Sequence, residues 1–395
     1  MLIASNDFIR AMKSPLLEVS IKLELYDQNM NYIKEITQDV HSDLGYITVS
    51  NSDMIRRSFS IRLDNSKGEY LFGEDNLIWL NKRIKLFIGL KLPNGEIEYV
   101  QQGIFILTEP LDAHNSNGKY VEINCVDKAY LFSNNRGKFI NEQIIQVGAP
   151  IASAIKTIAG HVGETMFNFD TIEPGDDRYI TVPYELTYSG TDNRWDAMKE
   201  LAQFAKCELF YDVYGYLRLK KIELNEIQSF PAVEKFEFGD NFYGGNTRRL
   251  DDTVLSNDIV VRGGSSSTAV ASYRLTVDEN NPLWANHPYS IQKIGTCTYF
   301  HNNGNPDPLL LDSENDCKWR AKFELMNRLG YTEEISVSTA PHYLLEASDI
   351  IEVIDHNNNV FGKYIVNSAN IPLSPENMTI EAQKQVSVID DWDFI

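Results

Sequence analysis

The sequence predicts a mainly β protein in which an α/β block separates two similar β regions. Three observations predict this class. Short runs that alternate apolar and polar residues fill both ends of the chain, helical periodicity is concentrated in the middle, and one string of strand and turn signals occurs twice. The chain has 395 residues, of which 43% are hydrophobic and 23% charged, an ordinary balance for a globular protein. A chain of this length holds roughly two or three domains.

The first β region covers residues 1–137. After a short helix expected at 7–13, with Ser5 or Asn6 as its cap, period-two alternation predicts strands that each bury one face. These runs lie at residues 17–25, 47–49, 59–63, 83–92, 103–107 and 120–126. Pro93-Asn94-Gly95 is a tight turn between two of them. The spacing is typical of a small barrel or sandwich, and we expect a first β-barrel domain here.

The middle of the chain, residues 138–235, is predicted to be an inserted α/β domain. Residues 149–160 place Ile151, Ile155 and Ile158 on one helical face, between a proline at the start and a glycine at the end. A second helix is expected after a cap at Thr191 or Asp192. It leads into a hairpin around Tyr214-Gly215.

The second β region covers residues 236–384 and is predicted to be a second β-barrel domain with one helix. That helix is expected at 316–329, where apolar residues recur at a spacing of four and Gly330 follows. Strands are expected at 259–263, 335–337, 350–354, 362–366 and 378–382. Residues 385–395 form an acidic and aromatic tail that ends in Asp390-Asp391-Trp392-Asp393-Phe394-Ile395.

An internal similarity links the two β regions. A strand at 85–88, a turn, a strand led by Gly103, a Pro-Leu pair and a strand at 121–123 follow one another in the first region. The same order recurs from 351 to 380, with Gly362 leading the equivalent strand. Two copies are weak as statistics, so the string alone leaves open whether it reflects duplication or chance likeness between hairpins.

The charge balance excludes several classes of protein. The formal net charge is −20, from 56 acidic and 36 basic residues, and such a surface repels nucleic acid and anionic lipid. The acidity fits either simple solubility or the wall of a channel along which DNA slides without binding. The first residues lack the features of a signal peptide, and no apolar run is long enough to cross a bilayer, so no membrane anchor is expected.

No known catalytic, cofactor or metal motif is present, and we expect no catalytic residues, no cofactor and no metal. The four cysteines show no CxxC, and the seven histidines have no metal-binding spacing. Gly263-Gly264-Ser265 lacks the lysine and helix of a phosphate loop, and loop 302–307 lacks a calcium pattern. The carboxylates that remain are interpreted as solvated: Glu164, Asp170, Glu173, Asp176, Asp177, the pair Asp251-Asp252 and the pair Asp390-Asp391.

Four segments carry a resemblance to a known family. They are Ile55–Asn65, the hairpin from Arg83 through Ile106, Asn257–Gly263 and His342–Ile351. The last matches only in part, because His342, Tyr343 and Ser348 replace the Asn, Pro and Gly of the family segment. In order and coverage the chain resembles the baseplate hub and tail-associated proteins of long-tailed phages, a family related to phage late control protein D and, distantly, to the type VI secretion spike.

The resemblance implies a structural role. Members of that family are homotrimers in which each subunit gives two similar barrels to a pseudo-hexameric ring. The implied partners are the tail tube or distal tail protein ring, a tip spike or fibre or tape-measure protein, and DNA only as passing cargo in the lumen. The chain would then be a baseplate hub protein of the phage tail tip, part of the virion, assembled in the host bacterial cytoplasm and not an enzyme.

Three points stay open at this level. The alternative function is a tail-associated cell-wall hydrolase or carbohydrate-binding tail protein that uses the α/β block; a close pair of buried carboxyls within residues 140–235 would favour it. A neck protein would show six-fold or twelve-fold symmetry instead. The tail with Trp392 and Phe394 is either a docking peptide for the next tail component or a loosely held terminus.

Overall fold

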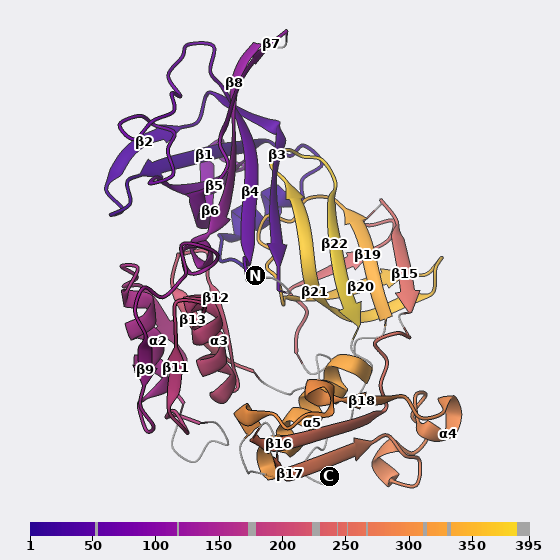
Figure 1. The fold of residues 1–395 in the computed structure, drawn as a ribbon. Helices are drawn as coiled ribbons and strands as arrows, with labels where there is room; N and C mark the ends of the chain where they lie inside the picture. The colour runs from indigo at the N-terminus through magenta and orange to yellow at the C-terminus, as the bar shows by residue number, and fades with distance from the viewer. Residues whose placement is uncertain are drawn as a thin grey trace.

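The structure is a computed structural model. It describes the whole chain except residues 52–53, 117, 173–178, 223–229, 243, 251, 266–267, 311–313, 330–332 and 385–395. Strands dominate, as the sequence predicts, and the described strands of both β regions join one large sheet (Figure 1). Its path runs β15-β19-β22-β21-β3-β4-β8-β6-β5-β1-β2, with β14 and β20 branching from β21 and β7 branching from β8.

The first β region begins with α1 (Asn6–Met12), capped by Ser5, whose hydroxyl accepts a hydrogen bond from the Phe8 amide. Its strands are β1 (Val19–Tyr26), β2 (Tyr32–Ile36), β3 (Val40–Ser50), β4 (Arg57–Asp64), β5 (Arg83–Lys91), β6 (Ile97–Leu107), β7 (Leu111–Asn115) and β8 (Gly118–Asp127). Alternate residues of these strands face one apolar core, as period-two patterning requires. The β7–β8 hairpin extends beyond this core at the top of Figure 1.

The α/β block starts with the 3₁₀ helix η1 (Lys128–Phe132) and has a core of its own. Its elements are β9 (Gln143–Ile145), α2 (Ile151–Gly160), β10 (Phe167–Phe169), β11 (Leu186–Tyr188), α3 (Arg194–Phe204), β12 (Cys207–Tyr211) and β13 (Leu217–Lys221). Both helices lie where the periodicity predicts them, with Ile151, Ile155 and Ile158 buried against α3. The hairpin predicted around Tyr214-Gly215 is the β12–β13 pair.

The second β region contributes β14 (Glu234–Glu237), β15 (Asn246–Leu250), β19 (Glu333–Thr339), β20 (Ile350–Asp355), β21 (Val360–Pro372) and β22 (Met378–Lys384) to the large sheet. Between β15 and β19 the chain builds a third core. It is formed by β16 (Asp258–Ser265), β17 (Thr268–Thr276), η3 (Pro282–Trp284), α4 (Ile291–Ile294), β18 (Thr298–Phe300), η4 (His301–Gly304), η5 (Pro308–Leu310) and α5 (Glu314–Leu329). The helix predicted at 316–329 is α5, and it packs on β16 and β17.

The closed barrels predicted for the two β regions are wrong. No sheet made by the described residues closes on itself, because β21 is long enough for one of its edges to pair with two different strands, while the other edge pairs with β22. Its first half pairs with β20, and its last residues, Ser368–Pro372, pair antiparallel with Tyr46–Ser50 of β3. This pairing, which we call the intrachain joint, merges the two β regions into one open sheet with a common core.

Two adjacent arginines hold the regions together next to the intrachain joint. Arg57 is buried, and its guanidinium donates hydrogen bonds to the Gln102 carbonyl at 3.2 Å and to the Leu345 carbonyl at 3.2 Å. Arg56 donates to the Ala347 carbonyl at 2.9 Å and forms an ion pair with Glu208 of the α/β block at 2.7 Å. Each arginine therefore binds a segment of the second region that is nearly three hundred residues away in sequence.

The carboxylate of Asp127 fixes the backbone of these arginines. It accepts hydrogen bonds from the amides of Arg56, Arg57 and Ala129, at 2.6, 3.1 and 2.9 Å. Burial raises the pKa of Asp127 to about 6, although the hydrogen bonds act in the opposite direction. We call Arg56, Arg57 and Asp127 the arginine junction.

Replacing Arg57 is expected to destabilise the whole sheet. Arg57→Ala leaves the Leu345 and Gln102 carbonyls buried without their donor, so the free energy of unfolding should fall by about 3 kcal/mol. Chemical denaturation measures the change. Arg10→Ala is the matched control, because the Arg10 side chain is 76% exposed. A loss below about 1 kcal/mol for Arg57→Ala would contradict the role of the junction.

A second contact holds α1 against the second β region and predicts a pH dependence. Glu234 on β14 lies 2.9 Å from Lys13 Nζ and 3.5 Å from His342 Nε2. Burial pushes the pKa of Glu234 upward, but the hydrogen bonds with His342 and Lys13 prevail and lower it from 4.5 to about 2. The folded state thus favours the ionised form, and the resulting stability is present above pH 4.5 and lost as the pH falls toward 2.

Glu234→Gln should remove this dependence. We expect the wild-type chain to exceed the variant in free energy of unfolding at neutral pH, and the difference to narrow steadily below pH 4.5. Urea denaturation across the acid range measures it. Glu18→Gln, at a side chain that is 66% exposed, is the control. If the difference in free energy of unfolding stayed constant down to the lowest pH, Glu234 would contribute through packing and not through its charge.

Candidate functional site

The two halves of the large sheet repeat one another in strand order. The first half runs β3-β4-β8-β6-β5, and the second runs β15-β19-β22-β21-β20. The registers also agree, so that a pair in one half has its counterpart in the other. Four equivalent cross-strand pairs illustrate this agreement: Phe105–Asp127 and Tyr364–Lys384, Leu107–Cys125 and Val366–Ala382, Leu86–Gly103 and Val353–Gly362, and Phe59–Cys125 and Ile335–Ala382. The repeat seen in the strings 85–123 and 351–380 therefore extends to hydrogen-bonding register, which chance likeness between hairpins does not produce.

The repeat assigns a counterpart to each strand of the intrachain joint. The counterpart of β3 is β15, since Ile47 pairs with Phe59 of β4 and Arg248 pairs with Ile335 of β19. The counterpart of the last residues of β21 is β7. There Leu111 pairs with Glu122 of β8, as Asn370 pairs with Thr379 of β22.

These two counterparts are edge strands. Among the described strands, β15 pairs with β19 alone, and β7 pairs with β8 alone. Leu250 of β15 is 58% exposed, whereas Val49 at the equivalent place in β3 is 1% exposed beneath the joint. Leu111 of β7 is 51% exposed. Each chain thus makes one joint internally, and the strands equivalent to the two sides of that joint, β15 and β7, each leave a row of unpaired backbone groups along one edge.

The charges on the two edges are complementary. β15 carries Arg248 and Arg249, and the edge around β7 carries Glu109 and Asp112, all four with exposed or half-exposed side chains. If the register of the intrachain joint is transferred to a joint between β7 and β15, Ile371 opposite Ile47 becomes Asp112 opposite Arg248. An opposite-charge pair directly across two strands stabilises their pairing, and like charges there destabilise it.

The sequence signal for these strands was weak. Asn246-Thr247-Arg248-Arg249-Leu250 has no apolar alternation, because neither face of β15 is covered in a single chain. Leu111–Asn115 reads as part of a polar loop for the same reason. The site could be found only through the repeat, by asking what occupies the positions equivalent to β3 and β21.

The acidic cluster of the α/β block is split by the structure. Glu164 is buried, lies 2.5 Å from Lys128 Nζ, and accepts hydrogen bonds from the Tyr211 hydroxyl and from two backbone amides. Asp170 accepts a hydrogen bond from the Lys221 amide and lies 3.5 Å from Arg218. These bonds give both carboxylates a structural role, and the interpretation of Glu164 as a solvated side chain is wrong because it is buried. Glu173, Asp176 and Asp177 lie outside the described residues.

The remaining motifs have local roles where the structure describes them. Asp252 is exposed, while Asp251 and the pair Asp390-Asp391 lie outside the described residues. Asp307 binds His301 at 2.7 Å instead of completing a calcium loop, and Gly263-Gly264-Ser265 is the end of β16. The described residues contain no group of three or more potential metal ligands, and none of their helices is both long and apolar enough to span a membrane.

Comparison with known proteins gives a result only at the level of structure. No protein-family model matches the sequence, and no curated protein does. The prophage MuSo2 43 kDa tail protein from Shewanella oneidensis matches with a TM-score of 0.59 and 11% identity, over 92% of this chain and 98% of that one. The tail protein from Neisseria meningitidis MC58 matches with a TM-score of 0.61 and 11% identity, over 92% and 96%.

A third match is the prophage tail protein gp18 from Listeria monocytogenes EGD-e, with a TM-score of 0.57 and 12% identity over 92% of this chain and 94% of that one. All three matches span nearly the full length of both chains, so they include the inserted units as well as the large sheet. The chain therefore has the fold of phage tail proteins.

Proposed function

We propose that this chain is a structural hub subunit of a phage tail or tail-like particle, active as a homotrimer. Its fold is that of phage tail proteins, and its sheet consists of two halves with the same order and register. Three such chains supply six equivalent half-sheets. A ring of six half-sheets built from three chains matches a six-fold tube on one side and a three-fold tip on the other.

The observation that carries the proposal is the pair of unfilled positions at β15 and β7. A contact between different surfaces of identical chains closes into a ring when the rotation between neighbours is right. The intrachain joint sets that rotation here, because it relates two equivalent half-sheets within one chain. Pairing of β7 with β15 of the next chain repeats the same step, so three joints within chains alternate with three joints between chains, and the open edges of β7 and β15 are covered.

The proposed ring gives the other features a purpose. It stacks on the tail tube or a distal tail protein ring, and it holds a spike, fibre or tape-measure protein at the tip. The formal charge of −20 per chain suits a lumen through which DNA passes without adhering. The proposal includes no catalytic step, and it places the protein in the virion after assembly in the host cytoplasm.

The edge charges provide the test. We expect a mass of three times 45.1 kDa by light scattering for the wild-type chain. Asp112→Arg and Arg248→Asp each place like charges across the joint, at a cost of roughly 0.2–1 kcal/mol per joint, and the ring has three such joints. Each variant should therefore weaken trimer formation by roughly three-fold to a hundred-fold. The double variant Asp112→Arg/Arg248→Asp restores opposite charges and should recover the trimer.

Control variants change charge without touching the edges. Asp75→Arg, on an exposed loop, and Arg10→Asp, on α1, should leave the mass unchanged. A chain that stays monomeric at high concentration would overturn the proposal, as would images with twelve-fold symmetry. Failure of the double variant to recover assembly would rule out the β7–β15 joint in particular.

A further inference from the structure

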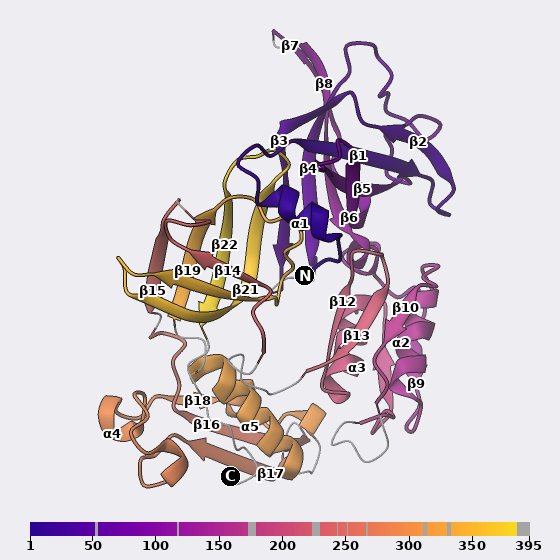
Figure 2. The same cartoon turned by 180° about the vertical axis from the view of Figure 1, so that it is seen from behind.

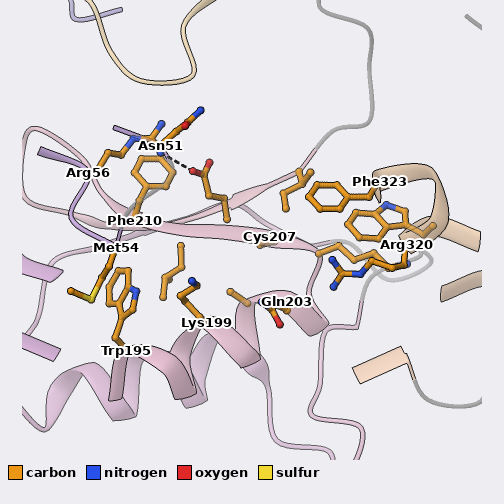
Figure 3. A pocket seen from close by; sticks show the side chains of 16 residues that line it. Asn51, Met54, Arg56, Trp195, Lys199, Gln203, Cys207, Phe210, Arg320 and Phe323 are labelled. Atoms are coloured by element: carbon orange, nitrogen blue, oxygen red, sulfur yellow. Dashed lines mark hydrogen bonds and ion pairs between the residues drawn. The ribbon is translucent and has the colours of Figure 1, made fainter. Parts of the chain in front are cut away.

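A pocket of about 240 Å³ lies where three parts of the chain meet. Lys199 and Gln203 come from α3, Cys207 and Phe210 come from β12, and Arg320 and Phe323 come from α5 (Figure 3). Asn51, Met54 and Arg56 line the remaining side. Sites for small-molecule ligands usually measure roughly 300–1,000 Å³, so this pocket is better suited to one or two inserted side chains.

The pocket is basic in an acidic protein. Among its described lining residues, four carry cationic side chains, Arg56, Lys199, Lys206 and Arg320, and one, Glu208, carries a carboxylate. Arg56 already binds Glu208, an ion pair drawn in Figure 3, Lys206 binds Asp316 at 3.1 Å, and Arg320 lies 3.8 Å from Glu324. Lys199 is exposed and forms no ion pair with a described residue. The positive charge left over by these pairs attracts carboxylates.

Two buried donors in the pocket wall also lack acceptors. The Trp195 side chain is 3% exposed, and its Nε1 has no hydrogen-bond partner among the described residues. The Nε of Arg320 is likewise buried without an acceptor. Buried donors are normally satisfied, so an occupant that brings oxygen acceptors would complete this wall.

One face of α5 presents aromatic rings that belong to no core. Trp319 and Phe323 stack with ring centroids 5.4 Å apart, and Arg320 lies over both rings. The opposite face of α5 carries Cys317, Ala321 and Leu325, which fill the third core. Trp319 and Phe323 are only partly buried, and such a stack gains energy from a further aromatic side chain placed against it.

We propose that the pocket binds the acidic and aromatic segment Asp390–Phe394 of the same chain. That segment offers three carboxylates to Lys199 and to the two unsatisfied donors, together with the rings of Trp392 and Phe394 for the aromatic stack. Charge and ring content thus match on both sides, in a chain that otherwise has a large excess of acid.

The segment that follows β22 is long enough to reach the pocket. Lys384, the last residue of β22, pairs with Glu333, the first residue of β19, and α5 ends four residues earlier at Leu329. A helix rises about 1.5 Å per residue, so Trp319 lies roughly 15 Å from that end of α5. Trp392 is the eighth residue after Lys384, and eight extended residues reach roughly 28 Å, nearly twice the length of α5 that has to be spanned.

Hydrogen exchange on the full chain tests whether the segment docks. We compare the wild-type protein with Trp392→Ala/Phe394→Ala and follow the backbone amides of α3 and α5. Docking predicts exchange about ten-fold faster in the variant at the ends of these helices that line the pocket, and no change in β1 or β5. Equal exchange in both proteins would overturn the proposal, and protection that disappears on dilution would assign the segment to another copy of the chain.

Binding in trans tests whether the pocket is the receptor. A synthetic peptide of residues 385–395 is titrated into Trp392→Ala/Phe394→Ala by calorimetry. Adding Lys199→Glu should weaken peptide binding by about ten-fold, whereas Lys220→Glu, an exposed lysine on β13 of the same block, should change it less than two-fold. Equal affinity for the Lys199→Glu and Lys220→Glu forms, or no binding to either, would overturn the pocket as the site.

Discussion

The structure depends on the intrachain joint between β21 and β3, and on the arginine junction beside it. Backbone pairing alone gives the joint only five residues on each strand. The buried Arg57 adds hydrogen bonds that hold the Leu345 segment of the second half against Gln102 of the first. A buried guanidinium is costly unless its donors are satisfied, so this arrangement tolerates only one relative placement of the two halves. In the proposed ring, that fixed placement would set the geometry between neighbouring half-sheets.

The repeat explains why strands that look unimportant in one chain become informative. Ile47 and Val49 of β3 are buried, while their counterparts in β15 are Arg248 and an exposed Leu250. At the first of these two positions an apolar residue stands where a neighbouring strand is present, and a charged residue stands where it is absent. Charged residues at an edge keep a lone chain from aggregating through that edge. They also make pairing selective for an edge of opposite charge, which β7 provides through Asp112.

Much of the fold could be predicted from the sequence, because helices and half-buried strands have distinct periods. The helices at 149–160 and 316–329, and the two hairpins led by Gly103 and Gly362, lie where those periods place them. Periodicity could not show whether the β regions close into barrels, because closure depends on which strand edges pair. Here β21 pairs with β3 and leaves the sheet open. The edge strands β7 and β15 were missed because strands with no covered face do not alternate apolar and polar residues. The basic pocket was missed because Arg56, Lys199 and Arg320 are far apart in sequence and belong to no motif.

The repeat also places the insertions. The connection from β15 to β19, which carries the third core, is equivalent to the short segment between β3 and β4 that contains Arg56. The α/β block begins after β8 and the segment 385–395 after β22, which are equivalent strands. All of these connections therefore leave the sheet at one end, opposite the β7–β8 turn, and Figures 1 and 2 show both inserted units on that side. Because edge pairing runs across the sheet and the insertions extend from its end, the units around the pocket can change in length or partner without disturbing the joints.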